Sequence, residues 1–445
     1  MQSVGICLYP GFFFQSVYSL DSMKIKFTKQ EWSTALYAAL VAFCLYTCLF
    51  SFRKAFNVAA YSGHSLFGLD YKIVLVITQV MGYMASKFYG IRFIAEMKRI
   101  GRGQLILILT GISWFSWLAF ALLPAPYNFW CLFFNGFPLG MLWGIVFSYV
   151  EGRRMTDLIS AALAVSFIFG SGLSKSVAAF TMSTWQVSEY WMPFITGAIF
   201  AGPLLLFVYL VEKLPPPTEK DVAHRTMRLP MKKEDRRKLL REYGTGLFFL
   251  IMVYILVTIL REVRDSFMAD MWRESGDVFN SSVFAQTETI ISLVMLLIIA
   301  SMVMVRNNKR AFNITHLIMA VGFLLSLLMT LAYKQQIINT WWWMLSVGMG
   351  LYLVYIPFNS ILFERFIASF RISGNVGFLI YLADAFGYLG SVAVLLSKTV
   401  LQIELSWLQF YTNLVMITGV SGLLATLISI RFFNKKPVQK QADLS

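Results

Sequence analysis

Long apolar runs separated by short polar segments repeat along the whole chain. Each run holds about 20 residues, enough to cross a bilayer as a helix. The twelve runs lie at residues 32–55, 72–92, 104–123, 128–150, 158–181, 190–212, 244–266, 283–305, 312–333, 341–363, 374–398 and 406–432. The pattern therefore predicts an all-α polytopic membrane protein with twelve transmembrane helices.

Composition supports this prediction. Hydrophobic residues make up 58% of the 445 residues and charged residues only 14%, which excludes an ordinary soluble domain. The net charge of +15 raises the question of a nucleic-acid partner. Most Lys and Arg residues, however, fall in alternate polar segments, as the positive-inside rule requires. We therefore expect both termini in the cytoplasm, a protein of the cell inner membrane, the lipid bilayer as a partner, and no nucleic acid.

One long polar segment divides the chain. We predict a cytoplasmic N-terminal segment, two six-helix bundles joined by a basic linker, and a cytoplasmic tail. Their limits are 1–31, 32–212, 213–243, 244–432 and 433–445. In the linker, the basic residues before Tyr243 predict an amphipathic helix at the membrane surface. Residues 1–22 lack the features of a signal peptide, and we interpret them as a gene-model extension before Met23.

The two halves repeat one another weakly. Arg53 near the end of the first run corresponds to Arg261 near the end of the seventh. The fourth and tenth runs both carry small or kinking residues that allow close helix contact and gating. These are Gly136, Gly140, Gly144, Gly348, Gly350 and Pro357. Two six-helix halves joined by a basic loop resemble the major facilitator architecture, in which substrate binds between the halves.

Charged residues inside the apolar runs are the candidates for function, because an ionised group at membrane depth is costly. The cations within or at the ends of the runs are Arg53, Lys54, Lys87, Lys175, Arg261, Arg264 and Lys398, and the carboxylates are Glu262, Asp265, Glu288 and Asp384. The alternative is that the cations extend to the headgroups. We expect Arg53, Arg261, Arg264, Lys87 and Lys175 to bind substrate, with the carboxylates as counter-charges or coupling groups.

Arginine binds carboxylate and phosphate groups through two parallel hydrogen bonds. Tyr46, Tyr83 and Tyr254 are expected to line the same cavity. The sequence therefore predicts a site for a small phosphorylated or carboxylated metabolite. Four scattered cysteines, three separated histidines and the lack of catalytic motifs predict no metal, no cofactor and no enzyme activity.

Several of these residues form a recognisable set. Arg53-Lys54, Ser86-Lys87-Phe88 and Leu260-Arg261 resemble the organophosphate:inorganic-phosphate antiporters of the major facilitator superfamily. The resemblance implies that the two arginines hold phosphate, that the lysine assists, and that transport is by antiport. The architecture covers nearly the whole chain, whereas the motifs cover about ten residues.

The chain departs from that family in places. Phe167 stands where the family has a histidine, and Glu96-Met-Lys-Arg99 replaces its usual Asp-Arg run. The chain also resembles an uncharacterised group of bacterial membrane proteins, which implies no activity. Three alternatives stay open: a proton-coupled carrier using Asp384 or Glu288, a non-transporting anion sensor, and a membrane enzyme. We expect a monomer.

Overall fold

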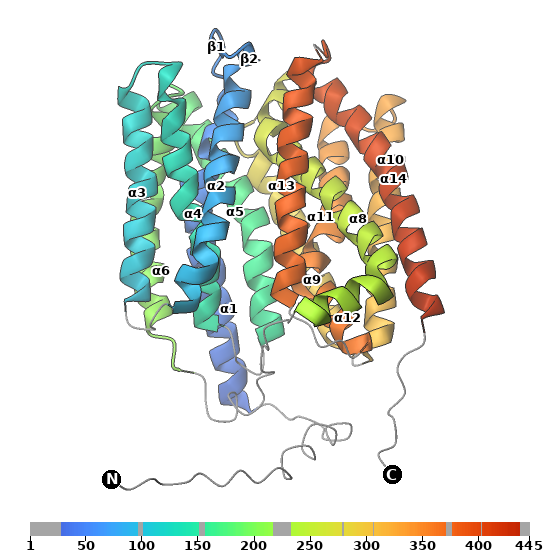
Figure 1. The fold of residues 1–445 in the computed structure, drawn as a ribbon. Coiled ribbons are helices and arrows are strands. Elements are labelled where there is room, and N and C mark those ends of the chain that lie inside the picture. Colours follow the sequence, from blue (N-terminus) through green and yellow to red (C-terminus); the bar gives the residue numbers. More distant parts are fainter. Residues whose placement is uncertain are drawn as a thin grey trace, which may run out of the picture.

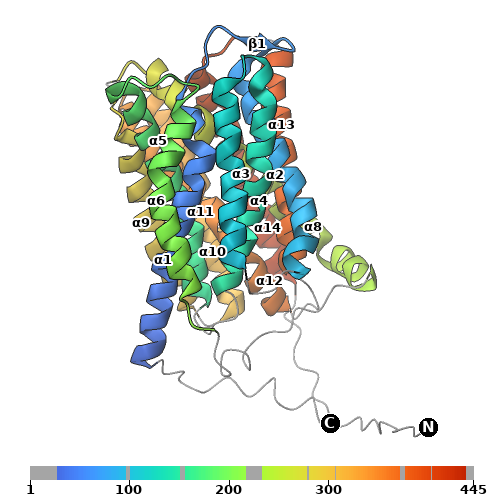
Figure 2. The same ribbon diagram turned by 90° about the vertical axis from the view of Figure 1, so that its left-hand side faces the viewer.

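The computed structural model describes residues 28–96, 101–150, 156–216, 233–277, 280–305, 307–370, 376–401 and 403–436. Over these residues the chain is almost entirely helical, and the long helices stand side by side as two bundles of six (Figures 1 and 2). The predicted fold class is therefore confirmed. The predicted limits 1–31 and 433–445 fall largely outside the described residues, as does the expected start at Met23.

The N-terminal bundle contains the first six long helices. They are α1 (Lys29–Lys54), α2 (Tyr71–Glu96), α3 (Arg102–Leu122), α4 (Trp130–Val150), α5 (Thr156–Thr184) and α6 (Met192–Glu212). Short 3-10 helices η1 (Ala55–Val58) and η2 (Tyr127–Phe129) follow α1 and precede α4, and a two-stranded hairpin, β1 (Ser65–Leu66) and β2 (Leu69–Asp70), precedes α2. Helix α1 packs on α5 and α6, while α4 packs on α2 and α3.

The C-terminal bundle contains the remaining long helices. They are α8 (Lys233–Glu274), α9 (Val283–Val303), α10 (Asn308–Lys334), α11 (Thr340–Ser360), α13 (Val376–Val400) and α14 (Trp407–Lys435), with the short helix α12 (Leu362–Phe370) between α11 and α13. Helix α8 packs on α13 and α14, and α10 packs on α11 and α14.

Local sequence explains where several helices begin. The side chains of Thr28, Asn307, Asn339 and Ser406 each accept a hydrogen bond from a backbone N–H of the first turn, which satisfies one of the free donors there. Ten segments of the described chain are long and apolar enough to cross a membrane by length and composition. Large apolar side chains on their outer faces remain exposed, as a lipid-facing surface requires.

Two features of the C-terminal bundle differ from the prediction. Helix α8 is one continuous element from Lys233 to Glu274, so the expected surface helix of the linker and the seventh span are joined. Figure 2 shows the start of α8 extending sideways from the bundle. Arg261 therefore lies about three and a half turns before the end of α8, and its predicted place at the helix end is wrong. Helix α12 was not predicted, because its short apolar stretch merges with the tenth run.

The bundles meet along α5 and α9, along α2 and α13, and where η1 packs on α8. We call the end of the molecule that carries β1 and β2 the hairpin end, and the end where α6 stops and α8 starts the linker end (Figure 1). Helices α1 and α8 both run towards the hairpin end, which brings Arg53 and Arg261 to the interface between the bundles.

Candidate functional site

The end of α1 is held by side chains from three other helices. Trp117 and Asn135 both donate to the carbonyl of Phe52, at 2.7 and 3.0 Å, and Gln79 donates to the carbonyl of Arg53 at 2.9 Å. Carbonyl groups near a helix end lack intrahelical partners, so these donors satisfy them inside the protein. The backbone that carries Arg53 is therefore fixed by α2, α3 and α4.

The Arg53 side chain is only 4% exposed, and among the described residues no carboxylate oxygen lies within 4.0 Å of its nitrogens. Its Cζ lies 3.8 Å from the centre of the Tyr83 ring, so the guanidinium stacks on that ring. Its Nε and Nη2 have no hydrogen-bond partner. A cation–π contact offsets only about 2 kcal/mol when desolvated, which leaves this buried cation incompletely satisfied.

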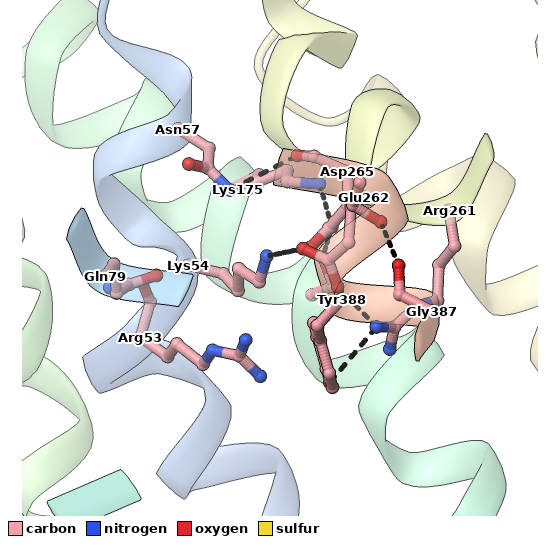
Figure 3. Close-up of polar contacts among 12 residues, drawn as sticks. Arg53, Lys54, Asn57, Gln79, Lys175, Arg261, Glu262, Asp265, Gly387 and Tyr388 are labelled. Atoms are coloured by element: carbon pink, nitrogen blue, oxygen red, sulfur yellow. Dashed lines mark hydrogen bonds and ion pairs between the residues drawn. The ribbon is translucent and has the colours of Figure 1, made fainter. Parts of the chain in front are cut away.

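Arg261 from the other bundle is better satisfied. Its Nη2 pairs with the neighbouring Glu262 and lies 3.3 Å from the Tyr388 hydroxyl. Its Cζ lies 4.5 Å from the centre of the Tyr355 ring. In Figure 3, Tyr388 lies between the guanidinium groups of Arg53 and Arg261. The ring centres of Tyr83 and Tyr388 are 5.6 Å apart, so aromatic side chains fill the space between the two arginines.

The other cations of this region converge on Asp265 of α8. Lys54 lies 2.6 Å and Lys175 lies 2.5 Å from its two carboxylate oxygens, and Ser171 donates to the same group. Lys54 also lies 3.5 Å from Glu262. The three donors come from α1 and α5, whereas both carboxylates come from α8 (Figure 3). These contacts therefore tie the two bundles together.

A second group of contacts joins helices of the C-terminal bundle to one another. Arg264 is 2.7 Å from Glu288 and also donates to the carbonyl of Met344 at 3.2 Å. Tyr254 donates to Asp384. The predicted counter-charges Glu288 and Asp384 thus bond residues of their own bundle, whereas Glu262 and Asp265 face the neighbouring one.

Another ion cluster closes the hairpin end. Lys72 lies 2.5 Å from Asp270 and donates to the carbonyl of Asn57 at 2.9 Å. Arg273 lies 3.1 Å from Asp270 and donates to the carbonyl of Val58. Lys72 is 2% exposed, lies in the first turn of α2 and joins the two bundles.

A narrow cavity adjoins Arg53 inside the N-terminal bundle. Its lining residues come from α1, α2 and α4, and besides Arg53 they are Tyr46, Leu49, Phe50, Tyr83, Leu139 and Leu142. Its volume is about 10 Å³, room for one water at most. The predicted residues Tyr46 and Tyr83 therefore do lie beside Arg53, whereas Tyr254 lies in the other bundle, stacked on Tyr355.

The remaining predicted residues include Lys87 and the glycines of the fourth and tenth runs. Helix α2 includes Lys87, but its side chain lies outside the described residues. The glycines of the fourth and tenth runs lie where helices touch: a Cβ at Gly136 would meet Gln79, one at Gly140 would meet Ser86, and one at Gly348 would meet Arg264.

In the same runs, a Cβ at Gly350 would meet Ser326. Gly144 is half-buried in α4, and Pro357 lies within the last turn of α11. Phe167, at the position of the family histidine, stacks on Phe50 and packs edge-on against Tyr355.

Sequence reasoning missed several polar and aromatic residues of the site. These are Asn57, Gln79, Asn135, Ser171, Tyr355 and Tyr388. Amides inside apolar runs were an available signal, since a buried amide needs partners. Asn135 and Gln79 bond each other at 2.7 Å as that rule requires. Nothing in the sequence distinguished Tyr388 from the other tyrosines. Among the described residues, no cluster of His, Cys, Asp and Glu could hold a metal ion.

Comparison with known proteins identifies the fold. A family model described as a family of unknown function, DUF5690, matches residues 55–436. No curated protein matches the chain significantly in sequence. Among solved structures, a crystal structure of a D-xylose-proton symporter is 16% identical with a TM-score of 0.59, over 90% of this chain and 97% of that one.

Two further structures agree. The xylose transporter XylE from E. coli, in an inward-open conformation, is 15% identical with a TM-score of 0.58, over 93% of this chain and 98% of its own. A bacterial homologue of the human drug peptide transporters PepT1 and PepT2 is 14% identical with a TM-score of 0.56, over 91% of this chain and 98% of its own. At this level of identity the likeness shows the major facilitator fold alone.

Proposed function

The chain belongs to the family of unknown function DUF5690, and we propose that it is a secondary transporter that carries a small organic anion across the cell inner membrane by alternating access. The observation that carries this proposal is the pair Arg53 and Arg261. One arginine comes from each bundle, both are at least nine-tenths buried, and they flank Tyr388 where the bundles meet.

Buried cations at membrane depth are costly, and chains retain them mainly along ion or substrate pathways. An anion bound between Arg53 and Arg261 would neutralise the first and compete with Glu262 for the second. Because the two arginines belong to different bundles, such an anion would also link its own binding to the relative position of the bundles. Both arginines come from the same chain, so a monomer contains the whole site.

The hairpin end supplies the gate in this proposal. Among the described residues, four ion pairs join the bundles: Lys54 with Glu262 and Asp265, Lys175 with Asp265, and Lys72 with Asp270. All four ion pairs lie between the level of Lys54 and the hairpin end. The positive-inside rule places that end outside the cell, so this conformation is the one closed to the outside. Opening it would require water to replace these ion pairs.

We also propose, from the resemblance to the antiporters, that the substrate is phosphorylated and that transport is by antiport. Proton coupling is a second candidate, because Asp384 and Glu288 are buried carboxylates of the C-terminal bundle that could exchange a proton during the cycle. It predicts that Asp384→Asn abolishes uptake driven by a pH gradient but preserves exchange of internal for external substrate.

The test is transport by the purified full chain in liposomes. Labelled phosphate, phenyl phosphate, phenylacetate and xylose are offered outside, with and without the same compound inside and with an imposed pH gradient. We expect uptake of at least one anion and none of xylose. Arg53→Gln and Arg261→Gln should reduce anion uptake to the level of empty liposomes, while Arg310→Gln, an exposed position, should not. Uptake of xylose alone, or anion uptake unaffected by both variants, would contradict the proposal.

A further inference from the structure

The buried cations of the described helices differ in one respect. Lys54, Lys72, Lys175, Arg261 and Arg264 each have a carboxylate within 4.0 Å. Arg53 alone has none, although it is 4% exposed. Arg53 is therefore the buried cation that a bound anion would stabilise most, because an unpaired buried charge is strongly unfavourable.

The unsatisfied part of Arg53 has a definite shape. The two nitrogens without partners are Nε and Nη2, which lie on the same edge of the planar guanidinium. That edge presents two parallel N–H groups, the arrangement that binds both oxygens of a carboxylate. The flat face of the group is already used, because it stacks on Tyr83.

The cavity that adjoins Arg53 is lined mainly by apolar side chains. The adjoining cavity is lined by Leu49, Phe50, Leu139 and Leu142 together with the rings of Tyr46 and Tyr83, and Arg53 is its one charged lining residue. A phosphate dianion placed there would leave oxygen atoms and a second negative charge against apolar side chains, at a high desolvation cost. A carboxylate needs only the one edge, and an apolar body attached to it would fill the leucine- and phenylalanine-lined space.

We propose that the Nε–Nη2 edge of Arg53 binds the carboxylate of a monoanionic substrate whose apolar body enters the cavity between α1, α2 and α4. This inference rests on the proposed transport function and names its substrate class. The cavity of about 10 Å³ is collapsed around its own side chains, so entry of the body accompanies a separation of α1, α2 and α4.

The test measures binding to the purified full chain at pH 7.5 by calorimetry and by shift of the melting temperature. The probes are acetate, butyrate, hexanoate and phenylacetate, with 1-hexanol as the neutral match and phenyl phosphate and inorganic phosphate as the dianionic matches. We expect affinity to rise about 4-fold for each added methylene group, and phenylacetate to bind more tightly than phenyl phosphate.

Variants at Arg53 examine the edge itself. Arg53→Gln should weaken phenylacetate binding about 30-fold or more. Arg53→Lys keeps the charge but loses the paired donors, and should recover only part of that loss. Arg310→Gln is the control and should bind as the unaltered protein does. If the Arg53 variants do not fold, the ligand series on the unaltered protein still decides the matter.

The outcomes separate this inference from the transport proposal. Tighter binding and transport of phosphate or phenyl phosphate, with carboxylates inert, would overturn the monocarboxylate and leave the transporter standing. Arg53→Lys with full affinity for phenylacetate would overturn the two-donor geometry. Absence of binding and of transport for every anion would overturn both proposals.

Discussion

Arg53 and Arg261 both lie where the two bundles meet, yet their surroundings differ. Arg261 is followed in sequence by Glu262 and pairs with it, whereas Arg53 is followed by Lys54. Lys54 then takes the carboxylates of α8, at 2.6 Å from Asp265 and 3.5 Å from Glu262. The carboxylates of α8 thus pair with Arg261 and Lys54, and among the described residues none lies within 4.0 Å of the Arg53 nitrogens.

This contrast distinguishes two residues that the predicted repeat pairs with each other. The Arg261–Glu262 pair belongs to the charge network of the closed hairpin end, so it contributes to the stability of this conformation. Arg53 makes no ion pair among the described residues, and its closest aromatic contact is the ring of Tyr83. A residue can therefore be ion-paired in one bundle while its predicted counterpart in the other has no ion pair within 4.0 Å.

The largest expected difference is in stability without ligand. Arg261→Gln should lower the free energy of unfolding by about 3 kcal/mol, because Glu262 loses its closest partner inside the protein. Arg53→Gln should leave stability unchanged or raise it, because it removes a buried cation that has no acceptor. Unfolding of both variants in a denaturing detergent titration measures this. Equal losses for the two variants would remove the distinction between the arginines.

A medium effect is expected when Arg261 is made to resemble Arg53. Glu262→Gln releases the guanidinium of Arg261 from its carboxylate, so a second cation becomes available to a ligand. Affinity for phenyl phosphate relative to phenylacetate should then rise about 10-fold, or about 1.4 kcal/mol. Calorimetry with both ligands measures the ratio. Glu404→Gln, at an exposed position, is the control and should leave this affinity ratio unchanged. If Glu262→Gln also leaves the ratio unchanged, Arg261 does not face the ligand.

The smallest effect is expected at Tyr388, between the two arginines. Tyr388→Phe removes a hydroxyl 3.3 Å from Arg261 but keeps the ring that packs 5.6 Å from Tyr83. The loss of one hydrogen bond should change stability by about 1 kcal/mol and phenylacetate affinity by less than about 5-fold. Thermal melting and calorimetry on the same preparation check both values. A loss as large as that of Arg53→Gln would make the hydroxyl a ligand group in its own right.

The fold was largely predictable because it depends on a signal carried by each segment alone. A run of about 20 apolar residues is helical and buried in lipid wherever it lies in the chain. The predicted helix ends were wrong where polar residues continue a helix beyond its apolar run. Helix α8 starts at Lys233 and extends beyond the predicted end at residue 266, because charged residues such as Asp265 and Asp270 stay in the helix once the other bundle supplies their partners.

The sequence by itself predicted twelve long helices in two halves and costly charges at Arg53, Lys175 and Arg261, because the hydrophobicity of each residue is known from its type alone. Only the tertiary structure decided which of these charges are neutralised. Lys54 and Lys175 meet Asp265 from helices far away in sequence, and the Arg53 edge stays unpaired because of where those helices cross. Pairing depends on distances of a few ångströms between helices, and no single helix contains that information.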